Sequence, residues 1–371
     1  MNLKIAILAG DGIGPEVILQ AKKTLSAIAV VYDHEFVFED AYVGAIAIDK
    51  TGSALPNQTL NLCLNTDAVL FGAIGDPKYD NPEAKIRPEQ GLLKLRNELG
   101  LFANIRPIKP YEALLDSSPL KREIIKDVDF VIYRELSGGV YVGEKSTNSD
   151  GTIASDSYEY SEEQISRISH LAFKEAQKRR KKVTLVDKAN VLETSRLWRK
   201  VVQKVAKDYP DVSLNYLYVD NAAKQLMLNP RQFDVILTEN MFGDILSDEA
   251  SVISSSSGLL ASVSIGNEKA LFEPIHGSYP EVKGKNIANP IASILAAAML
   301  LEHFGLNEEA KKVYEAVEKA FEHKIVTVDL SSISKFGTNE VGNFVSNFIL
   351  SKDDLLYFNN DNVHIGQSTI V

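Results

Sequence analysis

The fold class is decided first by residues 4–17, which read KIAILAGDGIGPEV. The apolar run at 4–9 is typical of a buried strand, and a glycine-rich turn follows it directly. Pro15 then stands at the first turn of a helical pattern over 15–31, a position that proline favours. The stretch therefore predicts a strand, a tight turn and a helix, which is the repeating unit of α/β proteins.

The same alternation continues along the chain. Further strands are predicted at 68–72, 128–134, 183–187, 212–219 and 235–238, and further helices at 89–99, 193–208, 286–304 and 308–322. This order predicts an α/β fold with a largely parallel sheet. Two segments lack a core pattern. Residues 137–157 predict a hairpin arm or a mobile loop, and the serine cluster at 251–258 predicts a crossing between two domains.

Composition limits the possible functions. A length of 371 residues suggests about two domains. The formal net charge of −10 disfavours nucleic acid and anionic membrane as partners. Cys63 is the only cysteine, which excludes an intrachain disulfide and fits a reducing compartment. The longest apolar stretch, 291–301, is shorter than the roughly 18 residues that span a bilayer, so it predicts a buried helix in a cytoplasmic protein.

The turn at 10–14 superficially resembles a dinucleotide-binding fingerprint. Its glycines could bring backbone amides to a pyrophosphate at the start of the helix. However, the spacing is G-x-G-x-G-P, with Pro15 directly after the third glycine. A tight turn without a ligand is therefore the favoured interpretation.

Several charged residues are typical of anion and cation sites. Guanidinium groups hold carboxylates through paired hydrogen bonds, and a dicarboxylic acid would need several of them. Two aspartates four residues apart face the same side of a helix, where a third carboxylate could complete a site for a hard divalent cation. The alternatives are ordinary ion pairs and solvated or helix-capping aspartates. The candidates are Arg96, Arg106 and Arg134 for the anion, and Asp244, Asp248 and Asp220 for the cation.

Two further residues could carry proton chemistry. Lys188 follows a buried strand, where desolvation would help it to lose a proton; the alternative is a lysine that pairs with an anion. Tyr141 lies among glycines that would let a ligand approach, and the alternative is a packing aromatic. Residues 272–278 and 284–290 form a loop before a helix, where backbone amides and His276 could cradle a nucleotide.

Together these segments resemble the β-decarboxylating dehydrogenases, the family of the isocitrate and isopropylmalate dehydrogenases. The resemblance runs from about Lys4 to about Phe348 and is carried by residues 9–16, 86–93, 101–107, 134–143, 186–192, 240–247 and 273–290. It implies a two-domain α/β fold distinct from a conventional Rossmann fold. The cofactor-binding domain would comprise 1–101 plus 255–371. The central domain, 102–254, would carry the dimer interface and an arm near 137–157.

The resemblance also implies a reaction. It is the NAD-dependent oxidative decarboxylation of 3-isopropylmalate to 4-methyl-2-oxopentanoate and CO₂, a step of leucine biosynthesis. Lys188 would accept or relay the hydroxyl proton, and Tyr141 would protonate the enol carbon after CO₂ leaves. Lys188 and Asp220 would come from the partner subunit, so that a homodimer shares its active sites. Arg96, Arg106 and Arg134 would hold the substrate, and Asp220, Asp244 and Asp248 would hold Mg²⁺ or Mn²⁺ beside it.

The resemblance places the cofactor and the substrate side chain as well. NAD would lie along the loop that contains Glu273, His276, Gly277, Ser278, Glu281 and Asn289. Asn289 would meet the adenine, and Glu281 would take the adenosine ribose hydroxyls, although most NAD-dependent members carry aspartate there. An apolar pocket suits an isopropyl group, because a carboxylate buried against leucine would be unpaired. Its residues would be Glu89, Leu92 and Leu93, with Val191 from the partner subunit.

More than one function remains open on the sequence alone. Within the family the substrate could be tartrate or malate, homoisocitrate or isocitrate. Outside it, the sequence leaves room for a non-catalytic regulatory subunit or for a conventional Rossmann dehydrogenase. Two departures from the family pattern stand out, the serines at 254–257 and a long tail after Ser351.

Overall fold

The computed structural model describes residues 1–351; the tail noted above lies outside the described residues. The chain forms two compact units. Among the described residues, the first comprises 1–99, 256–263 and 268–351, and the second comprises 100–255 with 264–267. The chain returns from the second unit to the first between Ser255 and Ser256, inside the serine cluster that predicts a domain crossing.

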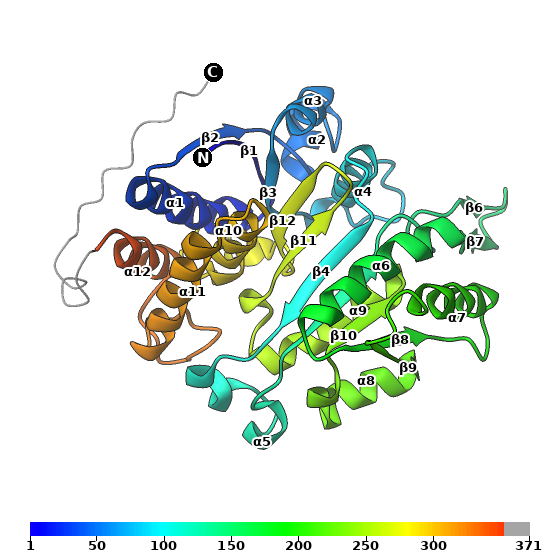
Figure 1. The fold of residues 1–371 in the computed structure, drawn as a ribbon. Helices are drawn as coiled ribbons and strands as arrows, with labels where there is room; N and C mark the ends of the chain where they lie inside the picture. Colours follow the sequence, from blue (N-terminus) through cyan, green and yellow to red (C-terminus); the bar gives the residue numbers. More distant parts are fainter. Residues whose placement is uncertain (352–371) are drawn as a thin grey trace. The chain divides into compact units, whose positions relative to one another are not determined.

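Four strands of the first unit, β2, β1, β3 and β12, pair in parallel. Its strand order is β2-β1-β3-β12, and β11, of which residues 261–263 belong to this unit, follows β12 (Figure 1). β1 pairs in parallel with both β2 and β3, and β3 pairs in parallel with β12. Every residue of β3 is buried, as expected for a strand covered on both faces. The bounds are β1 (Asn2–Gly10), β2 (Glu35–Asp40), β3 (Ala68–Ala73), β11 (Ala261–Ile265) and β12 (Ala270–Pro274).

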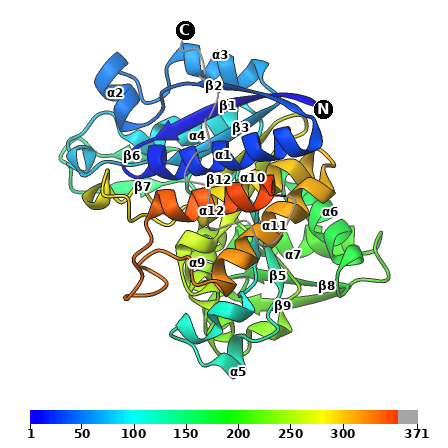
Figure 2. The same ribbon diagram turned by 90° about the vertical axis from the view of Figure 1, so that its left-hand side faces the viewer.

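Four long helices of the first unit pack on one another (Figure 2). They are α1 (Gly14–Tyr32), α10 (Ile291–His303), α11 (Asn307–Glu322) and α12 (Thr338–Leu350). α10 is buried along nearly its whole length, as its alanine-rich sequence predicts. It begins at Ile291 and not at residue 286, so the predicted start was wrong. The reason is that Asn289 accepts a hydrogen bond from the Ile291 amide and Pro290 precedes the first turn. Shorter helices are α2 (Ala45–Thr51), α3 (Asn57–Asn65) and α4 (Pro88–Glu98).

The second unit has the strand order β4-β5-β10-β8-β9. β4 and β5 are antiparallel, whereas β5, β10, β8 and β9 pair in parallel. The bounds are β4 (Ala103–Ile108), β5 (Phe130–Glu135), β8 (Lys182–Asp187), β9 (Ser213–Tyr218) and β10 (Val235–Thr238). The mixed α/β fold predicted from the alternating pattern is confirmed.

Helices and an arm complete the second unit. The helices are α5 (Arg122–Ile125), α6 (Glu162–Lys178), α7 (Glu193–Ala206), α8 (Val219–Leu228) and α9 (Asn240–Ala250). Apolar side chains of α6 and α7, among them Phe173 and Trp198, form one core cluster with β5, β8 and β10. Of the two structures considered for residues 137–157, the hairpin is the one observed: β6 (Lys145–Thr147) pairs antiparallel with β7 (Ala154–Asp156). No helix within residues 1–351 is both long and apolar enough to cross a bilayer.

Candidate active site

The glycine turn at 10–14 supports a neighbouring loop. The Ile13 amide donates to the carbonyl oxygen of Ser278 at 2.7 Å. A Cβ on Gly12 would lie 1.9 Å from that oxygen, and Gly12 also has a positive φ of 54°. The turn therefore contacts the 273–290 loop through its backbone.

The carboxylate of Asp11 organises the same turn. It accepts hydrogen bonds from the amides of Ala45 at 2.9 Å, Ile46 at 3.0 Å and Gly75 at 2.9 Å. Burial raises the pKa of Asp11, while these three amides lower it. Asp11 thus connects the turn to the start of α2 and to the segment after β3. These bonds stabilise the turn that contacts the 273–290 loop.

Arg96 and Glu273 form an ion pair inside the first unit. Arg96 Nη2 lies 2.7 Å from Glu273 Oε1, and both side chains are largely buried. Among the described residues, Arg96 Nε has no hydrogen-bond partner, so this guanidinium keeps a free donor. Glu89, Leu92 and Leu93 precede Arg96 on α4 at spacings that share its face of the helix. Leu95 fills the core instead, and Leu93 is 39% exposed.

The 273–290 loop presents both satisfied and unsatisfied polar groups. His276 Nδ1 lies 2.9 Å from the Gly277 oxygen, whereas its Nε2 is buried with no partner in residues 1–351. Burial lowers the pKa of His276, so the ring is neutral at pH 7. Glu281 is exposed and lines a hollow with Tyr279 and Pro280. Its carboxylate makes no side-chain hydrogen bond or ion pair within residues 1–351 and can accept hydrogen bonds from a ligand.

Asn289 has a structural role at the end of this loop. Its Nδ2 donates to Asp329 at 3.0 Å, and its Oδ1 accepts from the Ile291 amide at 3.0 Å. The side chain therefore caps the start of α10. A ligand that used this amide would have to replace one of those bonds.

The second unit gathers three of the predicted site residues around the carboxylate of a fourth, Asp244. Asp244, on α9, is bonded to the guanidinium group of Arg134 on β5, and Arg106 Nη2 on β4 lies 3.4 Å from it. The Tyr141 hydroxyl donates to Asp244 Oδ2 at 3.0 Å. Arg134 lies opposite Asn104 in the β4–β5 ladder, so Arg106, two residues further along β4, shares its face of the sheet.

Gly243 allows α9 to lie against this face. A Cβ on Gly243 would lie 2.7 Å from Arg134 Cγ, which is closer than such atoms can approach. Arg106 is held further by Asn104, whose Oδ1 accepts from its Nε at 2.6 Å, and by the hydroxyl of Ser247. Asn104 and Ser247 were not among the predicted site residues, although both fall within stretches that carry the family resemblance.

The charges around Asp244 set the protonation of its neighbours. Burial, together with the negative charge of Asp244 and its hydrogen bond, raises the pKa of Tyr141 to about 12, so the phenol keeps its proton at pH 7. Burial also raises the pKa of Asp248, and the charge of Asp244 adds to this effect. Within the described part of the chain, Asp248 makes no side-chain hydrogen bond or ion pair. The two aspartates therefore form a pair of carboxylates that a cation would stabilise.

Lys188 and Asp220 form a separate pair in the second unit. Lys188 follows β8 and bonds through Nζ to Asp220 in the first turn of α8. This hydrogen bond lowers the pKa of Asp220. Val191, three residues after Lys188, is 61% exposed. Residues 1–351 contain no group of three His, Cys, Asp or Glu side chains arranged to hold a metal ion, so Asp220 does not complete a set with Asp244 and Asp248 inside this chain.

The fold and these clusters place the chain in a class of α/β dehydrogenases. The family described as isocitrate/isopropylmalate dehydrogenase matches residues 4–345, and the chain belongs to that family. It is thus an oxidoreductase, as the resemblance implies.

Known relatives are similar in sequence to this chain over most of their length. The chain is 50% identical to a 3-isopropylmalate dehydrogenase of Bacteroides fragilis, over 94% of this chain and 99% of that protein. It is 51% identical to one of Bacillus subtilis, over 92% and 95%. The crystal structure of an isocitrate dehydrogenase from Methylococcus capsulatus is similar with a TM-score of 0.85 and 34% identity, covering 94% of this chain and all of that one.

Proposed function

We propose that this chain catalyses the NAD-dependent oxidative decarboxylation of 3-isopropylmalate to 4-methyl-2-oxopentanoate and CO₂, a step of leucine biosynthesis in the cytoplasm. The observation that carries the proposal is the convergence of Arg106, Arg134 and Tyr141 on Asp244. This geometry joins two anion-binding groups, a proton donor and a carboxylate. The names of the relatives at about 50% identity support the substrate.

The two arginines would bind the substrate by exchanging partners. Asp244 now supplies the negative charge that Arg106 and Arg134 face. A carboxylate of the substrate can take that place, because guanidinium groups hold carboxylates through directed hydrogen bonds. Arg96 would contribute through its free Nε donor. On α4, the apolar surface of Leu92 and Leu93 suits an isopropyl group, while a carboxylate there would be unpaired.

Two residues would carry out the proton transfers of the reaction. Lys188, bonded to Asp220, would relay the proton that leaves the C2 hydroxyl. Tyr141 would donate a proton to C3 after CO₂ is lost. The phenol is protonated at neutral pH, and the nearby charge of Arg134 lowers its pKa and so favours the transfer. The charge of Asp244 acts in the opposite direction until a cation or substrate compensates it.

The chain has residues that fit both a metal and a dinucleotide. Asp244 and Asp248 offer hard oxygen ligands one helical turn apart, and Asp248 is unpaired among the described residues. Asp220 of the partner subunit would be the third ligand. Glu281 offers an exposed acceptor for ribose hydroxyls, beside the hollow at Tyr279 and Pro280. When bound, Mg²⁺ or Mn²⁺ would stabilise negative charge on the C2 oxygen and NAD⁺ would accept the hydride.

The purified protein tests the proposal directly. We expect NADH formation at 340 nm with 3-isopropylmalate, NAD⁺ and Mg²⁺, and its loss when a chelator is added. Isocitrate, homoisocitrate, malate and tartrate should turn over far more slowly, as should NADP⁺ in place of NAD⁺. Preference for a tricarboxylate would overturn the substrate assignment and the argument from Leu92 and Leu93. Inactivity with every substrate would favour a regulatory subunit.

The choice of NAD over NADP depends on Glu281. A lysine cannot accept the ribose hydroxyls but can pair with a 2′-phosphate. Glu281→Lys should therefore raise the KM for NAD⁺ by about tenfold and lower the preference over NADP⁺. The control is Glu268→Lys, which makes the same charge change at an exposed position between β11 and β12. Equal kinetics for NAD⁺ in the two variants would place the cofactor elsewhere, for instance at the 10–14 turn.

A homodimer with shared sites is part of the proposal. On α8 and α9, Leu228 is 62% exposed and Ile245 is 57% exposed, and Val191 is similarly uncovered beside Lys188. Apolar side chains left open on neighbouring helices are typical of an association surface. A second copy packed there would cover them and would bring its Lys188, Asp220 and Val191 toward the Asp244 cluster. Every partner would thus supply part of the other's site.

A further inference from the structure

We propose that Asn240 is a positioning residue that aligns both Arg134 and the segment carrying Tyr141 with Asp244. The catalytic meaning of this inference rests on the proposed function, whereas the alignment itself can be measured without turnover. Asn240 is the first residue of α9 and is 2% exposed. It lies outside the set of groups that would touch substrate, metal or cofactor.

The side chain of Asn240 uses both ends of its amide. Oδ1 accepts a hydrogen bond from Arg134 Nε at 3.0 Å. Nδ2 donates to the carbonyl oxygens of Leu136 at 3.2 Å and Gly138 at 3.3 Å. One buried amide therefore connects three elements: α9, which carries Asp244; β5, which carries Arg134; and the segment that leads to Tyr141.

An amide suits this position for a chemical reason. Arg134 requires an acceptor, while the two carbonyl oxygens require donors, and a primary amide presents one of each kind. Aspartate would keep the acceptor for Arg134 but would turn a second acceptor toward the carbonyls. Alanine would leave both sides unsatisfied, which is costly in a buried place. Substitution can thus separate the two contacts.

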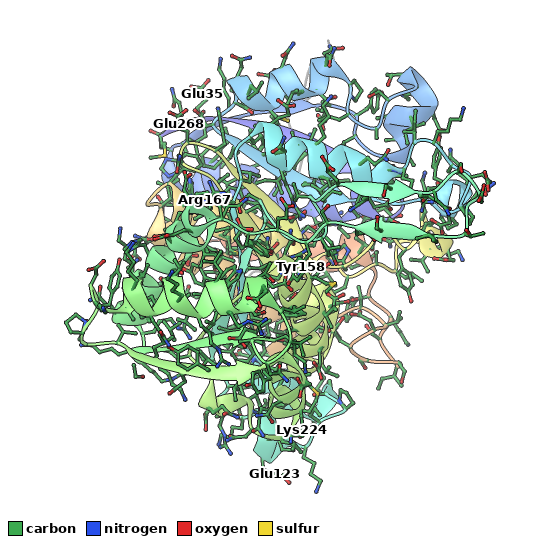
Figure 3. All side chains as sticks on the ribbon, turned by 90° about the vertical axis from the view of Figure 1, so that its right-hand side faces the viewer. Glu35, Glu123, Tyr158, Arg167, Lys224 and Glu268 are labelled. Carbon is green, nitrogen blue, oxygen red and sulfur yellow. The ribbon has the colours of Figure 1, made fainter. Side chains whose placement is uncertain are left out.

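Other groups bind the backbone amides of the 136–141 segment, whereas Asn240 binds two of its carbonyl oxygens. The carboxylate of Glu135 accepts the amides of Ser137 at 2.9 Å and Gly138 at 2.8 Å. Arg167, which is labelled in Figure 3, lies on α6. Its guanidinium is 3.6 Å from that carboxylate and 4.4 Å from the centre of the Phe102 ring. Together with the Glu135 carboxylate, Asn240 fixes the path of the chain just before Tyr141.

The backbone of Asn240 is fixed in turn by Tyr160. The Tyr160 hydroxyl accepts a hydrogen bond from the backbone N–H of Asn240 at 3.0 Å, and it donates one to the buried carboxylate of Glu239 at 3.2 Å. A Cβ on Gly138 or Gly139 would come within 2.5 Å of the Tyr160 ring or hydroxyl. The segment and the start of α9 therefore rest on the same aromatic side chain, and the Asn240 amide bridges the two.

The test compares Asn240→Asp with Thr238→Val in the full-length protein. Thr238 is also buried, and its hydroxyl donates to the Val186 oxygen at 2.9 Å, so its replacement removes a buried hydrogen bond just before α9. Within residues 1–351 the Thr238 hydroxyl makes no hydrogen bond to Arg134 or to the 136–141 segment, and valine keeps the backbone pairing of this position with Arg134 in the β10–β5 ladder. This substitution therefore controls for a general loss of stability.

Two measurements are made on each variant. The first uses 3-fluorotyrosine at position 141, whose ¹⁹F resonance reports the surroundings of the ring without turnover. The second follows 3-isopropylmalate turnover in D₂O, with the 2-keto acid trapped at once and the configuration at the deuterated C3 determined. Tyr141→Phe serves as the reference for loss of the proton donor.

We expect Asn240→Asp to shift the ¹⁹F resonance, to lower kcat at least about tenfold and to scramble the C3 configuration as Tyr141→Phe does. Because Arg134 keeps an acceptor, the KM should change by less than about threefold. Thr238→Val should leave resonance and configuration unchanged. An unmoved resonance in Asn240→Asp overturns the inference. A shifted resonance in an enzyme that never turns over 3-isopropylmalate supports the alignment and refutes the proposed function instead.

Discussion

Asp244→Asn should lower kcat/KM for 3-isopropylmalate by about 10³-fold or more, because one carboxylate serves three predicted groups. The substitution weakens the contacts that position Arg106 and Arg134 before the substrate binds, and it removes the charged acceptor of the Tyr141 hydroxyl. It also deletes one of the two hard ligands on α9. Steady-state rates over a range of Mg²⁺ concentrations would measure the effect, and saturating metal should not restore activity.

The matched control for this prediction lies on the same helix. Glu249→Gln makes the same chemical change at a partly buried position of α9 that has no contact with the arginines or Tyr141 among the described residues. Its kcat/KM should stay within about twofold of the parent value, as is usual away from a site. Comparable losses of kcat/KM in both variants would mean that activity depends on the total negative charge of α9 and not on Asp244 itself. Unchanged activity in Asp244→Asn would remove this cluster from the active site.

Two inactive variants should restore activity to each other when they are mixed. In the proposed shared-site dimer, Tyr141 of one subunit would work with Lys188 of the other. Lys188→Ala and Tyr141→Phe should each be nearly inactive alone. After subunit exchange, half of the dimers are hybrids, and each hybrid has one intact site, so the mixture should recover about a quarter of the parent activity.

The control for the mixing experiment uses two variants whose changed residues would both come from the same subunit. Lys188→Ala mixed with Asp220→Ala should produce no intact site in any hybrid, because in the proposed dimer both residues reach a given site from the same subunit. That mixture should remain inactive under the same exchange conditions. Failure of the Lys188→Ala and Tyr141→Phe mixture to recover, with exchange verified by mass spectrometry, would show that each chain completes its own site. Recovery in both mixtures would contradict the assigned sides.

Local pattern was enough to predict the class of fold. The strand and helix at 4–31 correspond to β1 and α1, because an apolar run, a glycine turn and Pro15 act through neighbouring residues only. The crossing near 251–258 coincides with the return of the chain to the first unit. Periodicity also placed Asp244 and Asp248 one turn apart on a helix. The start of α10 was missed because Asn289 caps it with a side chain that is also anchored to Asp329, forty residues away.

The sequence by itself determined the α/β alternation, the acidic balance and the residue types that a dehydrogenase of this family needs. Only the tertiary structure decided which of them meet. Arg106, Arg134 and Tyr141 reach Asp244 from segments more than a hundred residues away in sequence, because β4, β5 and α9 are adjacent in the folded second unit. The proposed role of Asn240 could not be predicted from the sequence either. An asparagine at a helix start is ordinary in a sequence, and its meaning comes from the guanidinium and the two carbonyl oxygens that folding brings to its two ends.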